Sequence, residues 1–295
     1  MEKTFDLEGF DAAVGRLCGF LDVKCDLTSH SILGHEIPVF TLGQGQKSVV
    51  YVGGVRGTES VLSRILLDFI GDYLERLKKG GTVFDINLSY LWRERRVIVV
   101  PMLNPDGVSY ATKGIDLKNP LAERVLKMNN GSEDLKDWQA NARGTDLSYN
   151  FDAGFGVHKA KAGLLNGAPK GYGGEYPESE PESAALCRFL RFLGEDLLGL
   201  VEFRLGSGEI KCSCRDKISA KTMAAGRILG RATGYRLIGP EKAEPEGGVA
   251  DWCIEKLSRP AYRVDCDLGK YREDKACACL FESLRRTFYT FPFMV

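Results

Sequence analysis

The side chains best suited to bind a metal or to act as nucleophiles are three histidines and nine cysteines in 295 residues. His30 and His35 belong to an early hairpin, and we interpret both as surface residues because a metal site needs converging ligands. His158 lies in a long irregular segment that could border a cleft, although we expect a surface position for it as well. Nothing in the sequence pairs any of these histidines with a serine or cysteine nucleophile.

Two pairs of cysteines have C-x-C spacing, Cys212 with Cys214 and Cys277 with Cys279. Structural zinc sites use longer spacings such as C-x-x-C, so neither pair predicts one. The odd number of cysteines and the lack of an apolar signal segment at the N-terminus favour reduced thiols in the cytoplasm. We therefore expect both pairs to be buried, the first near a strand end and the second on a helix.

The overall composition is that of an ordinary soluble globular protein, with 44% hydrophobic and 27% charged residues. Lysine plus arginine equals aspartate plus glutamate at 40 each, so no net field favours nucleic acid or an anionic membrane as a partner. The basic stretch Trp92–Arg96 is short and interrupted by an acid, which is typical of a solvated face. No apolar run approaches the roughly 18 residues of a membrane span.

Strands and helices are expected to alternate along the chain, which predicts an α/β fold in a single domain over residues 1–295. The expected strands are Cys25–Ile32, Ile37–Leu42, Lys47–Val52, Arg96–Val100, Leu200–Arg204, Glu209–Cys212 and Ala261–Cys266. The expected helices are Leu7–Leu21, Glu59–Leu77, Ser179–Leu193, Ala220–Thr233, Val249–Leu257 and Glu273–Phe288. This order favours a mixed, mostly parallel sheet with helices on both faces.

A long stretch from Pro101 to about Pro177 is rich in Gly, Asn, Pro and Asp and shows little periodicity. We expect it to be irregular, and long irregular segments inside compact domains are usually functional. Ligands of such sheets bind beyond the carboxyl ends of the strands. The loops after Val52, Val100, Phe203 and Val264 should therefore gather around the site.

Five segments, in order, resemble the zinc carboxypeptidase family. Val50–Glu59 is similar to the family pattern G-x-H-x-x-E, and Val99–Gly107 is similar to P-x-x-N-P-D-G. Asn141–Phe151 is similar to N-x-R-G-V-D-L-N-R-N-F, and Ser179–Glu182 matches S-E-P-E. Pro260–Asp265 resembles the late strand that ends at a glutamate in the family. The closest subgroup is that of bacterial enzymes that cut γ-D-glutamyl bonds in cell-wall peptides. The resemblance implies a zinc-carboxypeptidase-like fold.

The resemblance also implies which residues stand where the family binds zinc with two histidines and a glutamate. Arg56 stands at the first histidine and Glu59 at the glutamate. An alignment through the strand puts Arg204 at the second histidine, whereas one through Gly208 puts Leu205 there. Guanidinium groups offer only donors and a leucine offers no ligand atom, so we expect no metal and no other cofactor.

Other implied positions are altered as well. The family's general base corresponds to Asp265, with Asp267 as a rival, and either is one methylene shorter than glutamate. The Asn-Arg pair that clamps a substrate carboxylate in the family reads Ser148-Tyr149. Arg143 persists where the resemblance implies polarisation of the scissile carbonyl, and a structural role is equally expected for it.

These positions predict a network in which Arg56 and Arg204 face Glu59 and Asp265 in place of a metal. Such pairs could simply satisfy buried charge, or surplus guanidinium could bind a peptide carboxylate.

We therefore expect a catalytically inactive carboxypeptidase-like protein that binds an anionic or cell-wall peptide. One alternative is an active metallopeptidase that cleaves peptide or γ-glutamyl bonds with unusual ligands such as Glu59, Asp265 and a cysteine. Another is a hydrolase with a serine or cysteine nucleophile.

Overall fold

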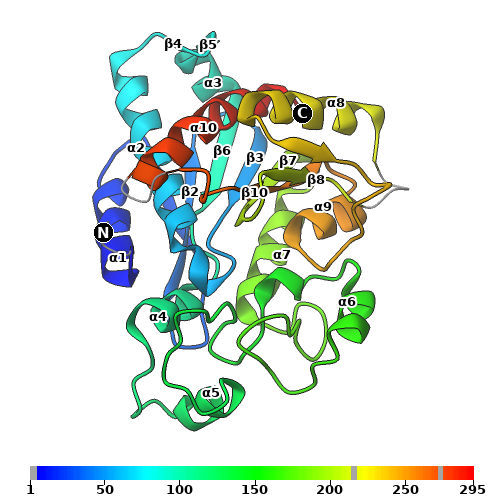
Figure 1. Ribbon diagram of the computed structural model, residues 1–295. Coiled ribbons are helices and arrows are strands. Elements are labelled where there is room, and N and C mark those ends of the chain that lie inside the picture. Colours follow the sequence, from blue (N-terminus) through cyan, green and yellow to red (C-terminus); the bar gives the residue numbers. More distant parts are fainter. Residues whose placement is uncertain (1–4, 214–217, 272–274) are drawn as a thin grey trace.

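The computed structural model describes residues 5–213, 218–271 and 275–295, and its centre is a twisted sheet of eight strands (Figure 1). In spatial order the strands are β1 (Lys24–His30), β2 (Glu36–Leu42), β6 (Arg95–Val100), β3 (Lys47–Val52), β7 (Leu197–Leu205), β10 (Ala261–Cys266), β8 (Glu209–Lys211) and β9 (Arg236–Ile238). The four central strands, from β6 to β10, run parallel, while the pairs β1–β2, β2–β6 and β10–β8 are antiparallel. The predicted mixed, mostly parallel sheet is confirmed.

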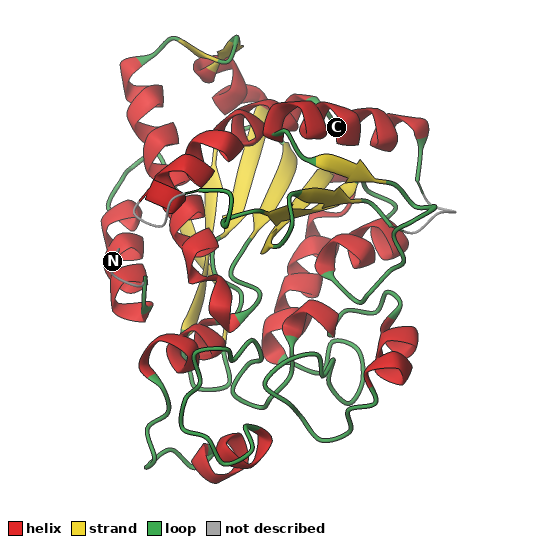
Figure 2. Ribbon diagram, in the orientation of Figure 1, coloured by secondary structure: helices red, strands yellow, loops and turns green. Residues whose placement is uncertain are grey.

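Helices lie on both faces of this sheet (Figure 2). They are α1 (Leu7–Cys18), α2 (Ser60–Lys79), α3 (Leu88–Glu94), α4 (Pro105–Lys113), α5 (Ala122–Met128), α6 (Phe155–Ala162), α7 (Pro181–Leu193), α8 (Ala220–Thr233), α9 (Val249–Leu257) and α10 (Ala276–Thr290). A separate two-stranded ribbon joins β4 (Thr82–Val83) to β5 (Ile86–Asn87). None of the helices among the described residues is long and apolar enough to cross a membrane.

Successive side chains of a strand point to opposite faces of the sheet, and this alternation determines which helices they contact. Tyr51 of β3 donates to the Phe288 carbonyl of α10 at 2.9 Å, and Tyr262 of β10 donates to the Thr222 carbonyl of α8 at 2.6 Å. Glu202 lies on β7, the strand between β3 and β10, and points to the opposite face of the sheet. There its side chain accepts a hydrogen bond from the Ala250 N–H of α9 at 3.3 Å. One face of the sheet is therefore aromatic and packed under α8 and α10, while the other carries charged side chains beneath α9.

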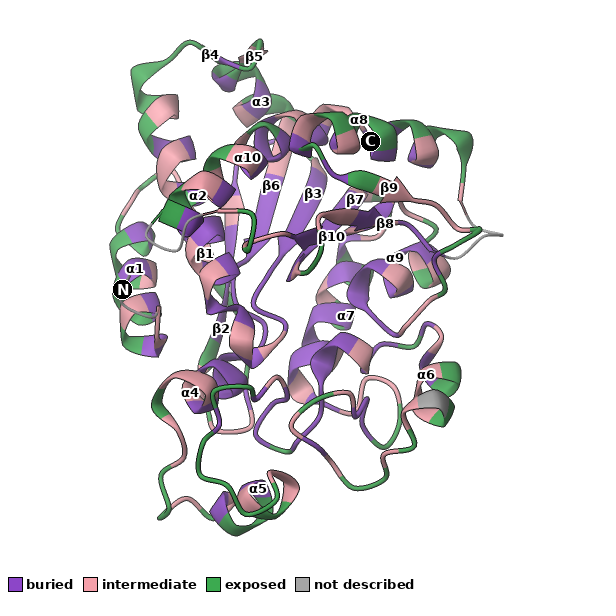
Figure 3. Ribbon diagram, in the orientation of Figure 1, coloured by how far each residue is buried: buried purple, intermediate pink, exposed green. Residues whose placement is uncertain are grey.

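The aromatic face forms the centre of the core, and most residues of the middle strands are buried (Figure 3). Tyr51 contacts Phe69 of α2, Phe203 of β7 and Phe288 of α10, with ring centroids 5.6–6.0 Å apart. Phe69 and Phe288 stack at 4.6 Å. These rings fix α2 and α10 over the central strands, and α2 begins at the residue after Glu59.

Several elements match their expected ranges, and others were missed. The strands Lys47–Val52 and Ala261–Cys266 and the helices Ala220–Thr233 and Val249–Leu257 have the expected bounds. The stretch expected to be irregular up to Pro177 contains α4, α5 and α6. Two of these helices have seven and eight residues, too short for a helical period to show.

The third, α4, begins within the Asn-Pro-Asp-Gly sequence, which has the composition of a turn. Its start is stabilised because the Asn104 side chain accepts from the Gly107 N–H at 2.9 Å and Pro105 occupies the first turn. The expectation also missed α3, β4, β5 and β9. The stretch Trp92–Arg96 is not a solvated face throughout, because it ends α3 and begins β6, and only Arg93 and Glu94 in it are exposed.

The cysteines follow the expected pattern only in part. Cys212 is buried directly after β8, while Cys214 lies outside the described residues, as does the expected start of the last helix at Glu273. Cys277 and Cys279 lie on α10 as expected, but Cys279 is only partly buried. The pair on the helix therefore does not fit a buried role at both positions.

One carboxyl group is buried at the first turn of α7. Burial raises the pKa of Glu182 to about 8, and the nearby carboxyl groups of Asp106 and Glu180 add to that effect. The Glu182 side chain is fully buried, and its Oε1 has no hydrogen-bond partner among the described residues. A carboxyl group in this position keeps its proton near neutral pH.

The Glu182→Gln substitution should change how stability depends on pH. The folded state binds the Glu182 proton more tightly than the unfolded state, so this contribution is fully present below about pH 4.5 and is lost as the pH rises through about 8. We expect urea unfolding to show the variant gaining about 2–5 kcal/mol relative to wild type between pH 5 and 8.5. The matched change at the exposed Glu133 should show no such gain, and parallel pH profiles for Glu182→Gln and wild type would contradict this view.

Candidate functional site

Arg56 and Glu59 are positioned by a 3₁₀ turn, Gly57–Glu59, that joins β3 to α2. Gly57 packs so tightly that a Cβ atom there would lie 2.4 Å from the Gly107 carbonyl oxygen and 2.5 Å from that of Trp138. Its N–H donates to the Gln139 carbonyl at 3.0 Å. Only glycine allows this approach, which fixes the residues on either side of it.

Glu59 and Glu202 hold the guanidinium of Arg204 between them. Arg204 Nε donates to Glu59 Oε1 at 3.2 Å, and Nη1 donates to Glu202 Oε1 at 3.1 Å. The Arg204 side chain is 3% exposed, and both glutamates are at least as deeply buried. Arg204 thus lies where the strand alignment predicted, and the rival residue Leu205 supplies only its backbone N–H, to Glu59 Oε1 at 3.1 Å.

Arg56 joins the same group from the solvent side. Its Nε donates to Ser148 Oγ and its Nη2 to the Tyr149 hydroxyl, both at 3.1 Å. Its Nε also lies 3.7 Å from Asp146 Oδ1, and the Arg56 side chain is 19% exposed. Residues 56, 59, 146, 202 and 204 form one unit, called the arginine–carboxylate cluster below.

Backbone donors complete the hydrogen bonding of the carboxylates. Glu59 Oε2 accepts from the Arg56 N–H at 3.3 Å, and Glu202 Oε2 from the Ala250 N–H at 3.3 Å. The two oxygens of Asp146 accept from the N–H groups of Ser148 at 3.2 Å and Gly171 at 2.9 Å. Buried carboxylates with guanidinium and N–H partners on both oxygens are well satisfied.

The electrostatics of the cluster favour its charged forms. Burial acts to lower the pKa of Arg204, but the carboxylates of Glu59, Glu202 and Asp146 outweigh it and raise that pKa above its usual value. Burial acts to raise the pKa of Asp146, but Arg56 and Arg204 outweigh it and lower that pKa. The guanidinium of Arg204 therefore stays protonated and Asp146 stays ionised across the physiological range.

Asp265 belongs to a second charged group beside the cluster. Its Cα is the register partner of Arg204 across the β7–β10 pair, so it reaches the predicted strand end. Its carboxylate lies 3.1 Å from Arg263 Nε and 3.4 Å from Lys211 Nζ. Arg263 also donates to Glu246 at 2.7 Å. Of the predicted network, the Arg204–Glu59 pair is present. The Arg56 guanidinium instead lies beside Asp146, and Asp265 pairs with Arg263 and Lys211, which were not considered.

The rival Asp267 lies beyond the end of β10. Its Oδ1 accepts from the Lys270 N–H at 3.2 Å in a turn, so it has a local structural role. Asp265, which is 8% exposed, is the residue of the two that lies on the charged face of the sheet.

Arg143 is directed to a separate acid. Its Nη1 lies 3.7 Å from Glu180 Oε2, and its side chain is 49% exposed. Within the cluster itself two guanidinium groups face three carboxyl groups, so the predicted surplus of guanidinium is not present there. Of the three arginines predicted for the site, Arg143 has the most accessible guanidinium.

His158 lies closer to the site than a surface histidine would. Its ring stacks on Tyr149, with centroids 3.7 Å apart and planes 4° from parallel, and its Nε2 lies 2.8 Å from the Gly171 carbonyl oxygen. It is therefore partly buried and supports the tyrosine that holds Arg56. His30 is exposed as expected, whereas His35 is partly buried.

The residues of this site do not fit a catalytic zinc ion. Two of the three implied ligand positions carry guanidinium groups, and both oxygens of Glu59 are already hydrogen-bonded. Over residues 5–213, 218–271 and 275–295, no three His, Cys, Asp or Glu side chains are placed to hold a metal ion together. Zinc requires deprotonated donor atoms, which a guanidinium cannot supply.

Sequence reasoning missed Glu202 and Asp146. Glu202 precedes Arg204 by two residues, and residues two apart on a strand share a face. The alternation of side chains along the strand could therefore have identified Glu202 as a neighbour of Arg204. Asp146 lies within the segment Asn141–Phe151, already singled out as a motif, two residues before Ser148.

A sequence model described as zinc carboxypeptidase matches residues 23–207, which is more than half of the chain. Gamma-D-glutamyl-L-diamino acid endopeptidase 1 from Lysinibacillus sphaericus is 27% identical over 240 residues, which cover 81% of this chain and 59% of that protein. The chain therefore spans less than two thirds of the length of this relative.

Solved structures share the fold. Carboxypeptidase A from Helicoverpa armigera superposes with a TM-score of 0.71 at 16% identity, covering 98% of this chain and 73% of that one. Murein-tripeptide amidase MpaA from Escherichia coli O157 superposes with a TM-score of 0.55 at 18% identity, covering 90% and 91%.

Removal of the buried guanidinium should destabilise the protein strongly. Arg204→Met leaves Glu59 and Glu202 without their cation, and we expect urea unfolding to show a loss of about 3–5 kcal/mol. Adding Glu59→Gln to this variant should recover part of the loss, because one uncompensated charge is removed. The control Arg143→Met, at a half-exposed pair, should change stability by less than about 1 kcal/mol. Equal effects of the two methionine variants would rule out the buried pairing.

Proposed function

The chain belongs to the zinc carboxypeptidase family, and we propose that it works without a metal, as a non-catalytic member that binds an anionic peptide. The observation that carries this proposal is the position of the Arg204 guanidinium between Glu59 and Glu202. A covalently attached cation in that position repels a second cation and uses the carboxylate oxygens that a metal would need. The fold alone does not supply the activity, because activity depends on the residues at the site.

The chemistry of the ligand follows from the accessible guanidinium groups. The relative from Lysinibacillus sphaericus is named for a bond between γ-D-glutamate and a diamino acid. A glutamate joined through its γ-carboxyl keeps a free α-carboxylate. Arg143 and Arg56, with side chains 49% and 19% exposed, are the members of the site that such a carboxylate can reach.

The alternative is an active metallopeptidase with unusual ligands. It would need Glu59, Asp265 and a cysteine to converge on one ion. Cys266 lies next to Asp265, but its thiol is buried, and burial raises its pKa well above the usual value. Asp265 is already paired with Arg263 and Lys211. No contact of these residues favours this alternative, so metal analysis decides between the two.

Elemental analysis should find little zinc in the purified protein after incubation with excess zinc and desalting. We expect far less than stoichiometric metal, and equal values for wild type and Glu59→Ala. Wild type should also fail to hydrolyse γ-D-glutamyl-L-diamino acid peptides in the presence of zinc. Near-stoichiometric zinc that disappears in Glu59→Ala would overturn the proposal and favour the alternative.

Calorimetric titration should detect binding of a γ-D-glutamyl peptide with a free α-carboxylate, and weaker binding of its α-amide. Arg143→Gln should weaken binding of the carboxylate about tenfold, because a charge-assisted hydrogen bond of about 1.5 kcal/mol is lost. The control Arg93→Gln changes an exposed arginine on α3 and should bind like wild type. Equal affinity for the acid and the amide would contradict recognition of a carboxylate.

A further inference from the structure

A pocket of about 660 Å³ lies at the β9 edge of the sheet, between α8 and the strand pair β8–β9. Figure 1 shows α8 above β9, the last strand of the sheet. Apolar side chains form part of the lining, with Met223 on α8 and Leu237 and Ile238 on β9. A pocket of this volume is typical of a site for a small molecule.

Close packing fixes the elements around this pocket. A Cβ atom on Gly226 of α8 would lie 3.1 Å from Leu237 Cδ1 of β9. In the turn after β9, a Cβ atom on Gly239 would lie 3.3 Å from the methyl group of Met223. The same turn is closed by the Lys242 N–H, which donates to the Gly239 carbonyl at 3.0 Å. Helix, strand and turn are therefore packed against one another around the pocket.

Charged side chains complete much of the lining, and the basic ones outnumber the acidic ones. They are Lys211, Arg227, Arg236, Lys242, Glu209 and Glu241. Arg236 donates to Glu209 at 2.5 Å, and Lys211 Nζ lies 3.4 Å from an oxygen of Asp265. The exposed charged groups of Arg227, Lys242 and Glu241 have no partner within residues 5–213, 218–271 and 275–295. Two unpaired cations thus face one unpaired acid.

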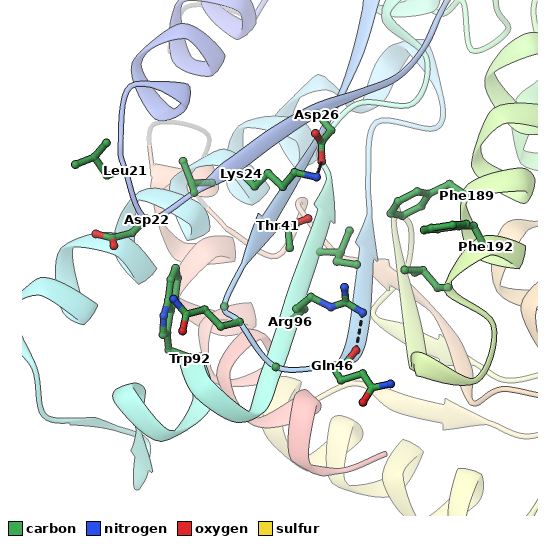
Figure 4. Close-up of a pocket in the computed structure, with 16 residues that line it drawn as sticks. Leu21, Asp22, Lys24, Asp26, Thr41, Gln46, Trp92, Arg96, Phe189 and Phe192 are labelled. Carbon is green, nitrogen blue, oxygen red and sulfur yellow. Dashed lines mark hydrogen bonds and ion pairs between the residues drawn. The ribbon is translucent and has the colours of Figure 1, made fainter.

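The groove beside the carboxyl end of α7, of about 710 Å³, has no such surplus (Figure 4). The charged residues of its lining are two acids, Asp22 and Asp26, and two bases, Lys24 and Arg96. Lys24 Nζ lies 2.7 Å from Asp26 Oδ2, and Arg96 donates to the Gln46 carbonyl at 2.5 Å. Of these two pockets, the one at β9 is therefore the one suited to an anion.

We propose that the pocket between α8 and β9 binds a small organic dianion. One anionic group pairs with Arg227 and the other with Lys242, and the apolar body of the ligand covers Met223, Leu237 and Ile238. Guanidinium and ammonium groups bind carboxylates and phosphates, and an apolar surface between them favours a hydrocarbon spacer. The pocket shares no residue with the arginine–carboxylate cluster, so this inference is independent of the proposed function.

Calorimetric titration with suberate, a straight-chain dicarboxylate, tests the requirement for two anionic groups. Octanoate has the same chain length and one carboxylate, and it should bind about tenfold more weakly than suberate. Suberate binding should also weaken as the salt concentration rises, because exposed charges are screened. Octanoate or inorganic phosphate that binds as tightly as suberate would overturn the proposal.

Substitutions test the location. Arg227→Gln and Lys242→Gln should each weaken suberate binding about tenfold, because each removes one ion pair. Glu241→Gln should strengthen it, since it removes a carboxylate that repels the ligand. The control Arg231→Gln removes the same charge one turn further along α8, at an exposed residue outside the lining, and should bind like wild type. Equal losses in Arg227→Gln and Arg231→Gln would reveal general attraction to a basic helix and refute the site.

The length of the ligand tests the apolar contact. From succinate to sebacate, affinity should rise as the spacer covers more of Met223, Leu237 and Ile238, and the heat-capacity change of binding should become more negative. Affinity that is the same along the series would contradict the apolar contact. Absence of binding by every member of the series would overturn the proposal as a whole.

Discussion

The guanidinium of Arg204 lies between two buried glutamates and brings together three parts of the chain that are distant in sequence. Glu59 belongs to the turn after β3, while Arg204 and Glu202 lie on β7, and Glu202 reaches the first turn of α9. Each of the three side chains would be unstable in this place without the others, because an isolated charge in a dry interior is strongly disfavoured. The pairing therefore fixes the relative positions of the β3 turn, the end of β7 and α9.

The outer side of the cluster depends on the same balance. Asp146 stays ionised because Arg56 and Arg204 lie near it, and Arg56 is held in turn by Ser148 and Tyr149. Tyr149 is supported by the stacked ring of His158. Polar contacts of this kind are satisfied only when all members are in place, so the site has one arrangement and little freedom to open around a metal.

Much of this arrangement could be predicted from the sequence, because strand ends and motif order are local properties. The buried apolar run at Lys47–Val52 and the capped helix Ala220–Thr233 were found where expected, and Arg56, Glu59 and Arg204 gather as the parallel strands imply. The pairing of Asp265 with Lys211 could not be predicted, because it depends on the register of β8 and β10. Arg263 was missed although it lies two residues before Asp265 on the same strand and therefore on the same face. The groove beside the carboxyl end of α7 gave no signal either, since its lining comes from four stretches of the chain, within residues 21–26, 41–46, 92–98 and 189–193.

A cation that is part of the polypeptide has no dissociation equilibrium, so neither chelators nor metal scarcity can empty the position of Arg204. The same property constrains how the sequence can change over generations. A single histidine at position 204 would leave Glu59 and Glu202 without a permanent positive charge, and a metal site would still lack its ligand at Arg56. A zinc site in this place would therefore require substitutions at both Arg56 and Arg204, and the change at Arg204 alone would leave two buried carboxylates without their cation.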